Sequence, residues 1–170
     1  MHKDLSELLE QKYHQYNVSD VVEDDPIQIP HLFSRKEDIE IAGFFSAIIA
    51  WGRRAMIIRN AQKLITLMDG EPYDFIRDFQ DSDLKPFRTF VHRTFQGKDC
   101  IGLLRSIKVV YQAHGGLEGI FTAGVNQEDP DVFSGIMHAR DCLLSQPWIE
   151  ARTHKHVANP SSGSAAKRIN

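Results

Sequence analysis

The clearest chemical bias in the sequence is a basic run between positions 53 and 68. Its charged residues are four cations, Arg53, Arg54, Arg59 and Lys63, with no acidic residue among them. Lys and Arg side chains and helix N-termini are the groups that bind phosphates. Adjacent arginines at a helix start oppose the helix macrodipole, so this position favours an anionic partner. We therefore expect a phosphate-facing edge here, with a solvated basic face as the alternative.

Trp51-Gly52 stands directly before this basic run, between two segments with helical periodicity. A tryptophan beside a glycine is typical of a core residue at a tight turn. An exposed tryptophan could instead act as a wedge, because aromatic and apolar side chains insert between DNA bases. The sequence alone leaves both interpretations open.

Lys167 is the candidate nucleophile of the chain. It follows two alanines near an expected helix start. At such a position a lysine suits amine chemistry when its side chain is also desolvated. A surface lysine without a chemical role is the alternative.

The sequence contains no recognisable metal or cofactor motif. His154 and His156 are two residues apart, but the other histidines are scattered, and no cysteine pair has zinc-ligand spacing. Cys100 and Cys142 are isolated, which predicts two reduced thiols rather than a disulfide. Gly115-Gly116 indicates a helix end rather than a phosphate loop. We expect no metal and no cofactor.

Length and composition indicate one globular domain. The chain has 170 residues and 19.4 kDa, with 42% apolar and 25% charged residues, values typical of folded proteins. The formal net charge of −3 means that any nucleic-acid contact must come from a local patch. No stretch approaches the roughly 18 apolar residues of a membrane span, and the start has no signal-peptide pattern. These features predict a cytoplasmic protein with no membrane partner.

Hydrophobic periodicity is helical nearly everywhere, so the expected fold class is all-α. Helices are expected over residues 5–16, 39–50, 53–68, 72–79, 99–114, 117–123 and 129–144. Phe87–His92 is the only candidate strand, and a helix fits that segment equally well. We expect a helical domain over residues 1–158, followed by a linker and the start of a further helix over residues 159–170.

Several helix starts carry capping signals. Asp4 and Asp99 are the expected N-caps of their helices, and Ser34 with Glu37 has the spacing of a capping box. The helix behind this box is apolar nearly all round, which predicts that it is buried at the centre of the fold. Its expected core residues are Ile41, Phe44, Phe45, Ile48 and Ile49. The last residues begin a helix without a C-cap, as expected for the N-terminal part of a longer protein.

Five stretches together resemble an uncharacterised bacterial family known only as a domain of unknown function. They are Asp25–Glu40, Ala50–Arg53, Phe90–Phe95, His114–Leu117 and Gly163–Asn170. The resemblance covers essentially the whole chain, and members of the family continue beyond its last residue. It implies no established activity.

The central helix, the short break and the second amphipathic helix also resemble the opening of the helix-hairpin-helix DNA glycosylases. In those enzymes the break faces DNA and offers a side chain to the gap left by an extruded base. The resemblance implies an orthogonal multi-helix domain like the N-terminal part of that fold, with Lys167 near the Schiff-base lysine of lyase-type members. The DNA-binding residues that it implies are Trp51, Gly52, Arg53, Arg54 and Arg59. The chain lacks a complete hairpin, the catalytic aspartate and an iron–sulfur cysteine set, so it should be inactive by itself.

These features lead to one expected function and two alternatives. The expected function is that of a glycosylase-like base-excision repair protein that binds duplex DNA, flips a damaged base and cleaves its glycosidic bond. The first alternative is a non-catalytic helical module that binds DNA or protein. The second is a small-molecule enzyme on the same scaffold, which is disfavoured because no polar cluster converges in the sequence.

Overall fold

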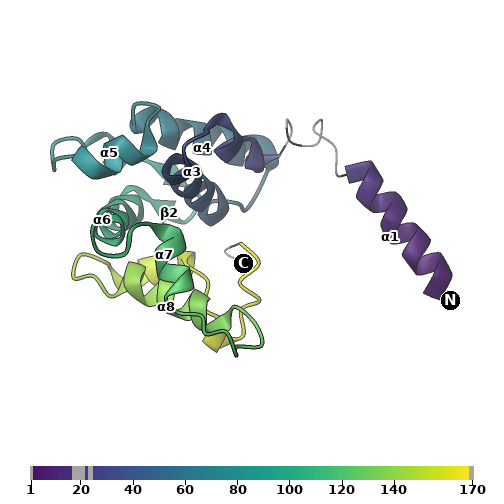
Figure 1. Ribbon diagram of the computed structural model, residues 1–170. Coiled ribbons are helices and arrows are strands. Elements are labelled where there is room, and N and C mark those ends of the chain that lie inside the picture. Colours follow the sequence, from purple (N-terminus) through teal and green to yellow (C-terminus); the bar gives the residue numbers. More distant parts are fainter. Residues whose placement is uncertain (1, 17–21, 23–24, 169–170) are drawn as a thin grey trace.

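The computed structural model describes residues 2–16, 22 and 25–168, and within them the fold is mostly helical, as the periodicity predicts. Figure 1 shows α3, α4 and α5 as one group beside a second group of α6, α7 and α8, while α1 projects away from both. No described helix is long and apolar enough to cross a bilayer. The helices and strands are α1 (His2–Tyr16), η1 (Pro26–Gln28), η2 (Pro30–Leu32), α3 (Lys36–Ile48), α4 (Arg54–Leu67), α5 (Pro72–Asp78), η3 (Pro86–Thr89), β1 (Val91–His92), β2 (Phe95–Gln96), α6 (Gly97–His114), α7 (Leu117–Thr122), α8 (Phe133–Leu144), η4 (Ala151–His156) and η5 (Pro160–Ser162), where η marks a 3-10 helix.

Helix α3 supplies the centre of the hydrophobic core. The five residues expected to be buried, Ile41, Phe44, Phe45, Ile48 and Ile49, are all buried. This helix packs against α4, α5 and η2, and α6 in turn packs against α5 and α8. A helix that is apolar on most of its circumference needs neighbours on most sides, and α3 has them. The prediction of a buried central helix is confirmed.

The expected capping box at Ser34 is wrong. Helix α3 begins at Lys36, and the preceding Arg35 makes no side-chain capping bond. Arg35 donates from Nε to Glu37 at 3.3 Å and from Nη1 to Asp74 of α5 at 3.2 Å. The Glu37 carboxylate therefore accepts from Arg35, which also bonds to the distant helix α5, and it does not cap α3.

Asp99 is not the N-cap of its helix, although it does take part in capping. Helix α6 begins at Gly97 behind the N-cap Gln96, and Asp99 is its third residue. The Gln96 N–H donates to Asp99 Oδ2 at 2.8 Å, and the Gln96 side chain accepts from the Asp99 backbone N–H. This reciprocal pair is a capping box. The pairing of Gln96 with Val91 in the small sheet fixes where the helix can begin.

Two other helix starts also differ from expectation. Helix α1 begins at His2, before the expected cap at Asp4, and α8 begins at Phe133 rather than at Asp129. Asp129 lies in the preceding loop, where its Oδ2 accepts from the Ser134 hydroxyl at 2.5 Å. Its side chain thus holds the loop against the first turn of α8.

The apolar stripe of α1 is present but exposed. Leu5, Leu9 and Tyr13 are each more than half exposed to solvent. The helical spacing of these residues therefore predicts the helix correctly. It does not indicate what, if anything, packs against the apolar face.

The candidate strand Phe87–His92 divides into two structures. Its first part lies in η3, and Val91–His92 forms β1, which pairs antiparallel with β2 in the register Val91 to Gln96 and His92 to Phe95. The sheet of the described residues consists of these two strands. Its turn is formed by Arg93 and Thr94, so this short hairpin presents Arg93 at its tip.

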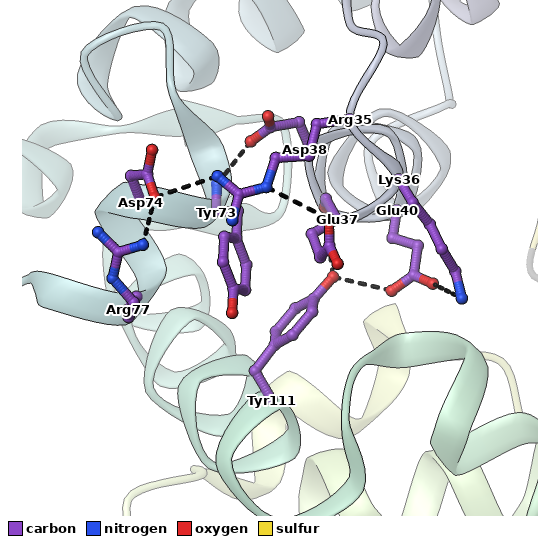
Figure 2. A network of polar contacts seen from close by, with 9 residues as sticks. All are labelled: Arg35, Lys36, Glu37, Asp38, Glu40, Tyr73, Asp74, Arg77 and Tyr111. Atoms are coloured by element: carbon purple, nitrogen blue, oxygen red, sulfur yellow. Dashed lines mark hydrogen bonds and ion pairs between the residues drawn. The ribbon is translucent and has the colours of Figure 1, made fainter.

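A polar network ties α3 to α5 and α6, as Figure 2 shows, and also to α7. Glu40 Oε2 accepts from the Tyr111 hydroxyl of α6 at 2.8 Å and from the Leu117 N–H of α7 at 2.9 Å. Asp38 Oδ1 accepts from the Tyr73 N–H of α5 at 2.8 Å. Burial, reinforced by the bond to Glu40, raises the pKa of Tyr111. The carboxylates of α3 are therefore structural tethers.

The tail after residue 158 packs onto the helices. Helix η5 contacts α8, and Ala166 is buried with a left-handed φ of +50°. Lys167 and Arg168 form a turn, so no helix has begun by Arg168. The rest of the further helix expected here lies outside the described residues.

Replacement of Phe45 tests the central helix. Phe45→Ala should lower the free energy of unfolding by about 3–5 kcal/mol, because it removes a buried ring and leaves a cavity. Leu32→Ala is the control, since Leu32 is 65% exposed, and it should change stability by about 0.5 kcal/mol or less. Urea unfolding of both variants measures the difference. Equal losses in the two variants would contradict the burial of Phe45.

The two cysteines should differ in reactivity. Both are free thiols; Cys100 is buried and Cys142 is half-buried. Burial raises the pKa of each thiol, most strongly that of Cys100, and the thiolate is the reactive form. In thiol titration of the native protein, Cys142 should react slowly and Cys100 only after denaturation. Cys142→Ser is the control that should abolish the native reaction, and a disulfide in the native sample would contradict this assignment.

Candidate functional site

The first turn of α4 carries two adjacent arginines with no acidic partner among the described residues. Arg53 is the N-cap and Arg54 the first residue of α4; both are exposed, and the cap lacks a side-chain bond. Arg35, Arg77 and Arg105, in contrast, all pair with carboxylates. Since the first N–H groups of a helix also attract negative charge, this end of α4 is suited to an anion.

Arg93 adds a third cation from a distant part of the sequence. It occupies the hairpin turn with φ +53°, a conformation that costs a non-glycine residue roughly 1–2 kcal/mol. Its side chain lies against Gly52: a Cβ at Gly52 would stand 3.3 Å from Arg93 Nη1. Gly52 itself has φ +109°, which favours glycine. The Trp51-Gly52 break and the hairpin tip therefore meet.

Trp51 is half-buried within a group of rings rather than free in solvent. His92 stacks on it with ring centroids 6.2 Å apart, and the His156 ring is 5.5 Å away. The guanidinium of Arg168 lies 5.2 Å from the Trp51 ring, an arrangement typical of a cation–π contact. Insertion of Trp51 into DNA would require Arg168 to move aside. The wedge role of Trp51 stays a prediction.

His92 holds the Trp51 break in place. Its Nε2 lies 3.0 Å from the Trp51 carbonyl oxygen, and its Nδ1 lies 2.8 Å from the Asn60 amide nitrogen. A neutral ring protonated on Nε2 satisfies both bonds, because it donates to the carbonyl and accepts from the amide. Burial lowers the pKa of His92, which favours this neutral form. His92 thus joins the hairpin, α4 and the break.

A fully buried carboxylate, Asp99, fixes η4 beside these rings. Asp99 Oδ1 accepts from the Thr153 hydroxyl at 2.8 Å, and Oδ2 lies 3.2 Å from Arg152 Nη2 and 3.6 Å from His156 Nε2. Burial lowers the pKa of His156, against the opposing effect of the Asp99 charge. The His154–His156 spacing does not form a metal site, because His156 is buried while His154 is exposed. Among the described residues, no group of three or more His, Cys, Asp or Glu side chains could hold a metal ion.

A cleft of about 700 Å³ opens beside Arg54, and we call it the α3–α4 cleft. Its floor is α3, its walls come from η1, η2 and α4, and the tail closes one side with Lys167 and Arg168. Ser46 lies on the floor, and its hydroxyl is buried without a hydrogen-bond partner among the described residues. Asp25 also lines the cleft, but its Oδ1 accepts from the Ile27 N–H at 3.0 Å.

A comparison with known protein families shows the family to which this chain belongs. The family described as "Protein of unknown function (DUF2400)" matches residues 25–170. The chain belongs to this family. The match begins after α1, so the DUF2400 region comprises the two helix groups and the tail. No curated protein and no solved structure matches the chain, and the resemblance to helix-hairpin-helix glycosylases stays a prediction.

The DUF2400 fold brings together part of the residue set expected from the sequence. Gly52, Arg54 and Lys167 line the α3–α4 cleft together, and Trp51 and Arg53 flank it. Arg59 is exposed further along α4 and does not line the cleft. Lys167 is exposed in a turn, and its role as a Schiff-base lysine stays a prediction.

Three residues of this region are not predicted by any local sequence pattern: Arg93, Arg168 and Ser46. Arg93 falls within one of the stretches that resemble the family, but nothing local shows that it meets Gly52. Arg168 lies beside the candidate Lys167 and reaches Trp51 only through the path of the tail. Ser46 looks like an ordinary small residue in an apolar helix. Each of the three owes its place to tertiary contacts.

Asp99 should be essential for the stability of this region. Asp99→Asn should lower the free energy of unfolding by about 3–5 kcal/mol, because it leaves the buried partners of the carboxylate uncompensated. Asp81→Asn is a matched control: the Asp81 side chain is 84% exposed in its pair with Arg105, and its loss should cost about 0.5 kcal/mol. Chemical denaturation measures both. A loss below 1 kcal/mol for Asp99→Asn would contradict the role assigned to the carboxylate.

Proposed function

We propose that this DUF2400 chain binds duplex DNA through phosphate contacts of a basic edge, defined as Arg53, Arg54, Arg59 and Arg93. The observation that carries the proposal is the meeting of the α4 start with the hairpin tip, where Arg93 lies against Gly52. The edge residues have no ion pair with a described residue, so their charge is available to an external anion. Such contacts set register on a duplex without reading its sequence.

The distribution of charge along α4 supports the same proposal. The basic edge lies at the N-terminal end of this helix of 14 residues, which spans about 21 Å. The surface around its C-terminal end is acidic, and a shallow pocket there is lined by Asp69, Glu71, Asp74, Asp78 and Asp83. A polyanion would be attracted by one end and repelled by the other, which orients its approach. The net charge of −3 is compatible with DNA binding for this reason.

Base excision is the finer form of the proposal. Two features support it. A buried helix, the Trp51-Gly52 break and a basic helix follow one another in an order that resembles the glycosylases, and Trp51 lies beside the basic edge. In this form Trp51 acts at a loosened base and Lys167 supplies an amine. The non-catalytic alternative shares the basic edge and differs only in the chemistry. Base release from damaged duplex separates the two, because the alternative binds without release.

The salt dependence of duplex binding tests the basic edge. Each lost phosphate contact should reduce the slope of log K against log salt by about 0.9. The double variant Arg53→Ala with Arg54→Ala should therefore weaken binding to all sequences alike and flatten the slope by about 1.8. Fluorescence anisotropy of a labelled duplex with the full chain, titrated at several salt concentrations, measures both effects.

Arg77→Ala is the matched control for this experiment. Arg77 is also an exposed helical arginine, but it pairs with Asp74 and Asp78 on the acidic side. Its replacement should leave the slope unchanged. A full chain that fails to bind duplex at low salt, or a double variant with the parental slope, would contradict the proposal.

A further inference from the structure

The α3–α4 cleft brings two further cations, Lys167 and Arg168, beside Arg54 of the basic edge. Its charged lining residues are the cations Arg54, Lys167 and Arg168 and the single acid Asp25. The Asp25 carboxylate already caps η1 through the Ile27 N–H. The cations make no ion pair with a described residue, so the cleft concentrates positive charge in a concave, partly enclosed space. Cations that only contact solvent would not have to lie together in a concave space.

The Arg168 side chain is fixed in position at the cleft by contacts with other residues. Its guanidinium lies over the Trp51 ring, and its Nη1 lies 3.5 Å from the Ile48 carbonyl oxygen at the end of α3. Its side chain is half-buried. A cation fixed in this way loses little freedom when it binds an anion, because its position is already set.

Ser46 is the second, independent indication of a ligand. The residue is 5% exposed, it lines the cleft, and its hydroxyl has no hydrogen-bond partner among the described residues. Buried polar groups are nearly always hydrogen-bonded. A ligand group that displaces the atoms covering this hydroxyl would satisfy it.

Gly43 keeps the floor of the cleft open. Glycine in the middle of a helix lowers helix stability relative to alanine, yet Gly43 stands inside α3 and lines the cleft. A Cβ built at Gly43 would meet only Pro30 Cβ, at 3.9 Å, which is ordinary contact. A methyl group therefore fits at Gly43, whereas a larger side chain would enter the cleft. Its absent side chain leaves space above α3, between apolar walls that include Ile27 and Ile57.

We propose that the α3–α4 cleft binds a nucleoside 5′-monophosphate unit. The phosphate would meet Arg54, Lys167 and Arg168, and the nucleoside would lie on the apolar floor, with a polar group bonded to Ser46. A phosphate monoester carries close to two negative charges at neutral pH, whereas each phosphate within a strand carries one. Three cations against one carboxylate match the monoester better. The volume of about 700 Å³ is in the range of small-molecule sites.

Calorimetric titration of the full chain with deoxyadenosine 5′-monophosphate tests this site. The nucleotide should bind at least about tenfold more tightly than either deoxyadenosine or inorganic phosphate, a ratio worth about 1.4 kcal/mol. Gly43→Leu should abolish binding by filling the floor, while Gly43→Ala, the matched control, should bind as the parent does. Ser46→Ala and Lys167→Ala should each weaken binding several-fold and serve as a second test if Gly43→Leu does not fold.

Two sources could supply this ligand, a free nucleotide or the 5′-phosphorylated end of a DNA strand. If the strand end is the source, a 5′-phosphorylated oligonucleotide should displace the nucleotide, and its 5′-hydroxyl counterpart should not. If the free nucleotide is the source, neither oligonucleotide should compete. Both results support the site. Displacement by both oligonucleotides alike would overturn it, because the monoester would then be irrelevant.

The site does not depend on the proposed function, and their failures are distinguishable. Arg53→Ala with Arg59→Ala should weaken duplex binding and leave nucleotide binding intact, since neither residue lines the cleft. Gly43→Leu should have the opposite effects. Nucleotide binding no tighter than that of deoxyadenosine, or binding insensitive to both Gly43→Leu and Lys167→Ala, would overturn the inference.

Discussion

The carboxylate of Asp99 is fully buried, and it joins the start of α6, the hairpin strand β2 and the 3-10 helix η4. A buried charge is tolerated only when hydrogen bonds and a countercharge compensate it, and Thr153, Gln96 and Arg152 do so. The hairpin then presents Arg93 at its tip, and η4 directs the tail back towards Trp51. The surroundings of the cleft therefore depend on one carboxylate outside it.

Cations in this protein serve two different purposes. Arg35 and Arg77 are held by Asp74, and together they tie α3 to α5 in the network of Figure 2. At the other end of α4, Arg53 and Arg54 have no such partner among the described residues. Exposed ion pairs contribute little to stability, so the paired arginines mainly offset part of the negative charge of an acidic surface that stays acidic overall. The unpaired ones leave their charge for something outside the chain, and this asymmetry is the physical basis of the proposed function.

How much the sequence could predict depends on whether the signal was local. The expected helix over 53–68 is α4, Arg54–Leu67, and Gly70, with φ +77°, supports the turn after it. The buried face of α3 also followed from periodicity. The capping predictions failed where a distant contact decided the outcome: Arg35, which holds the Glu37 carboxylate, also bonds to Asp74, and the pairing of Gln96 with Val91 places the start of α6 before Asp99. The sequence pointed to Trp51–Arg54 and to Lys167, which come together around the cleft, but not to the residues that meet them. The approach of Arg93 and Arg168 depends on how the hairpin and the tail pack, which no local pattern encodes.

The contact between Gly52 and Arg93 links two segments that are 41 positions apart. A β-carbon at position 52 would press on the Arg93 side chain, while the arginine itself is kept in a left-handed backbone conformation. A side chain at position 52 is therefore disfavoured twice, by the backbone conformation of the break and by the approach of Arg93. Among related sequences, a side chain at position 52 should occur only where the break has another backbone conformation and the turn residue at position 93 is shorter or the hairpin differs in length. A comparison of positions 52 and 93 among related sequences would thus show whether glycine at the break and arginine at the hairpin tip occur together.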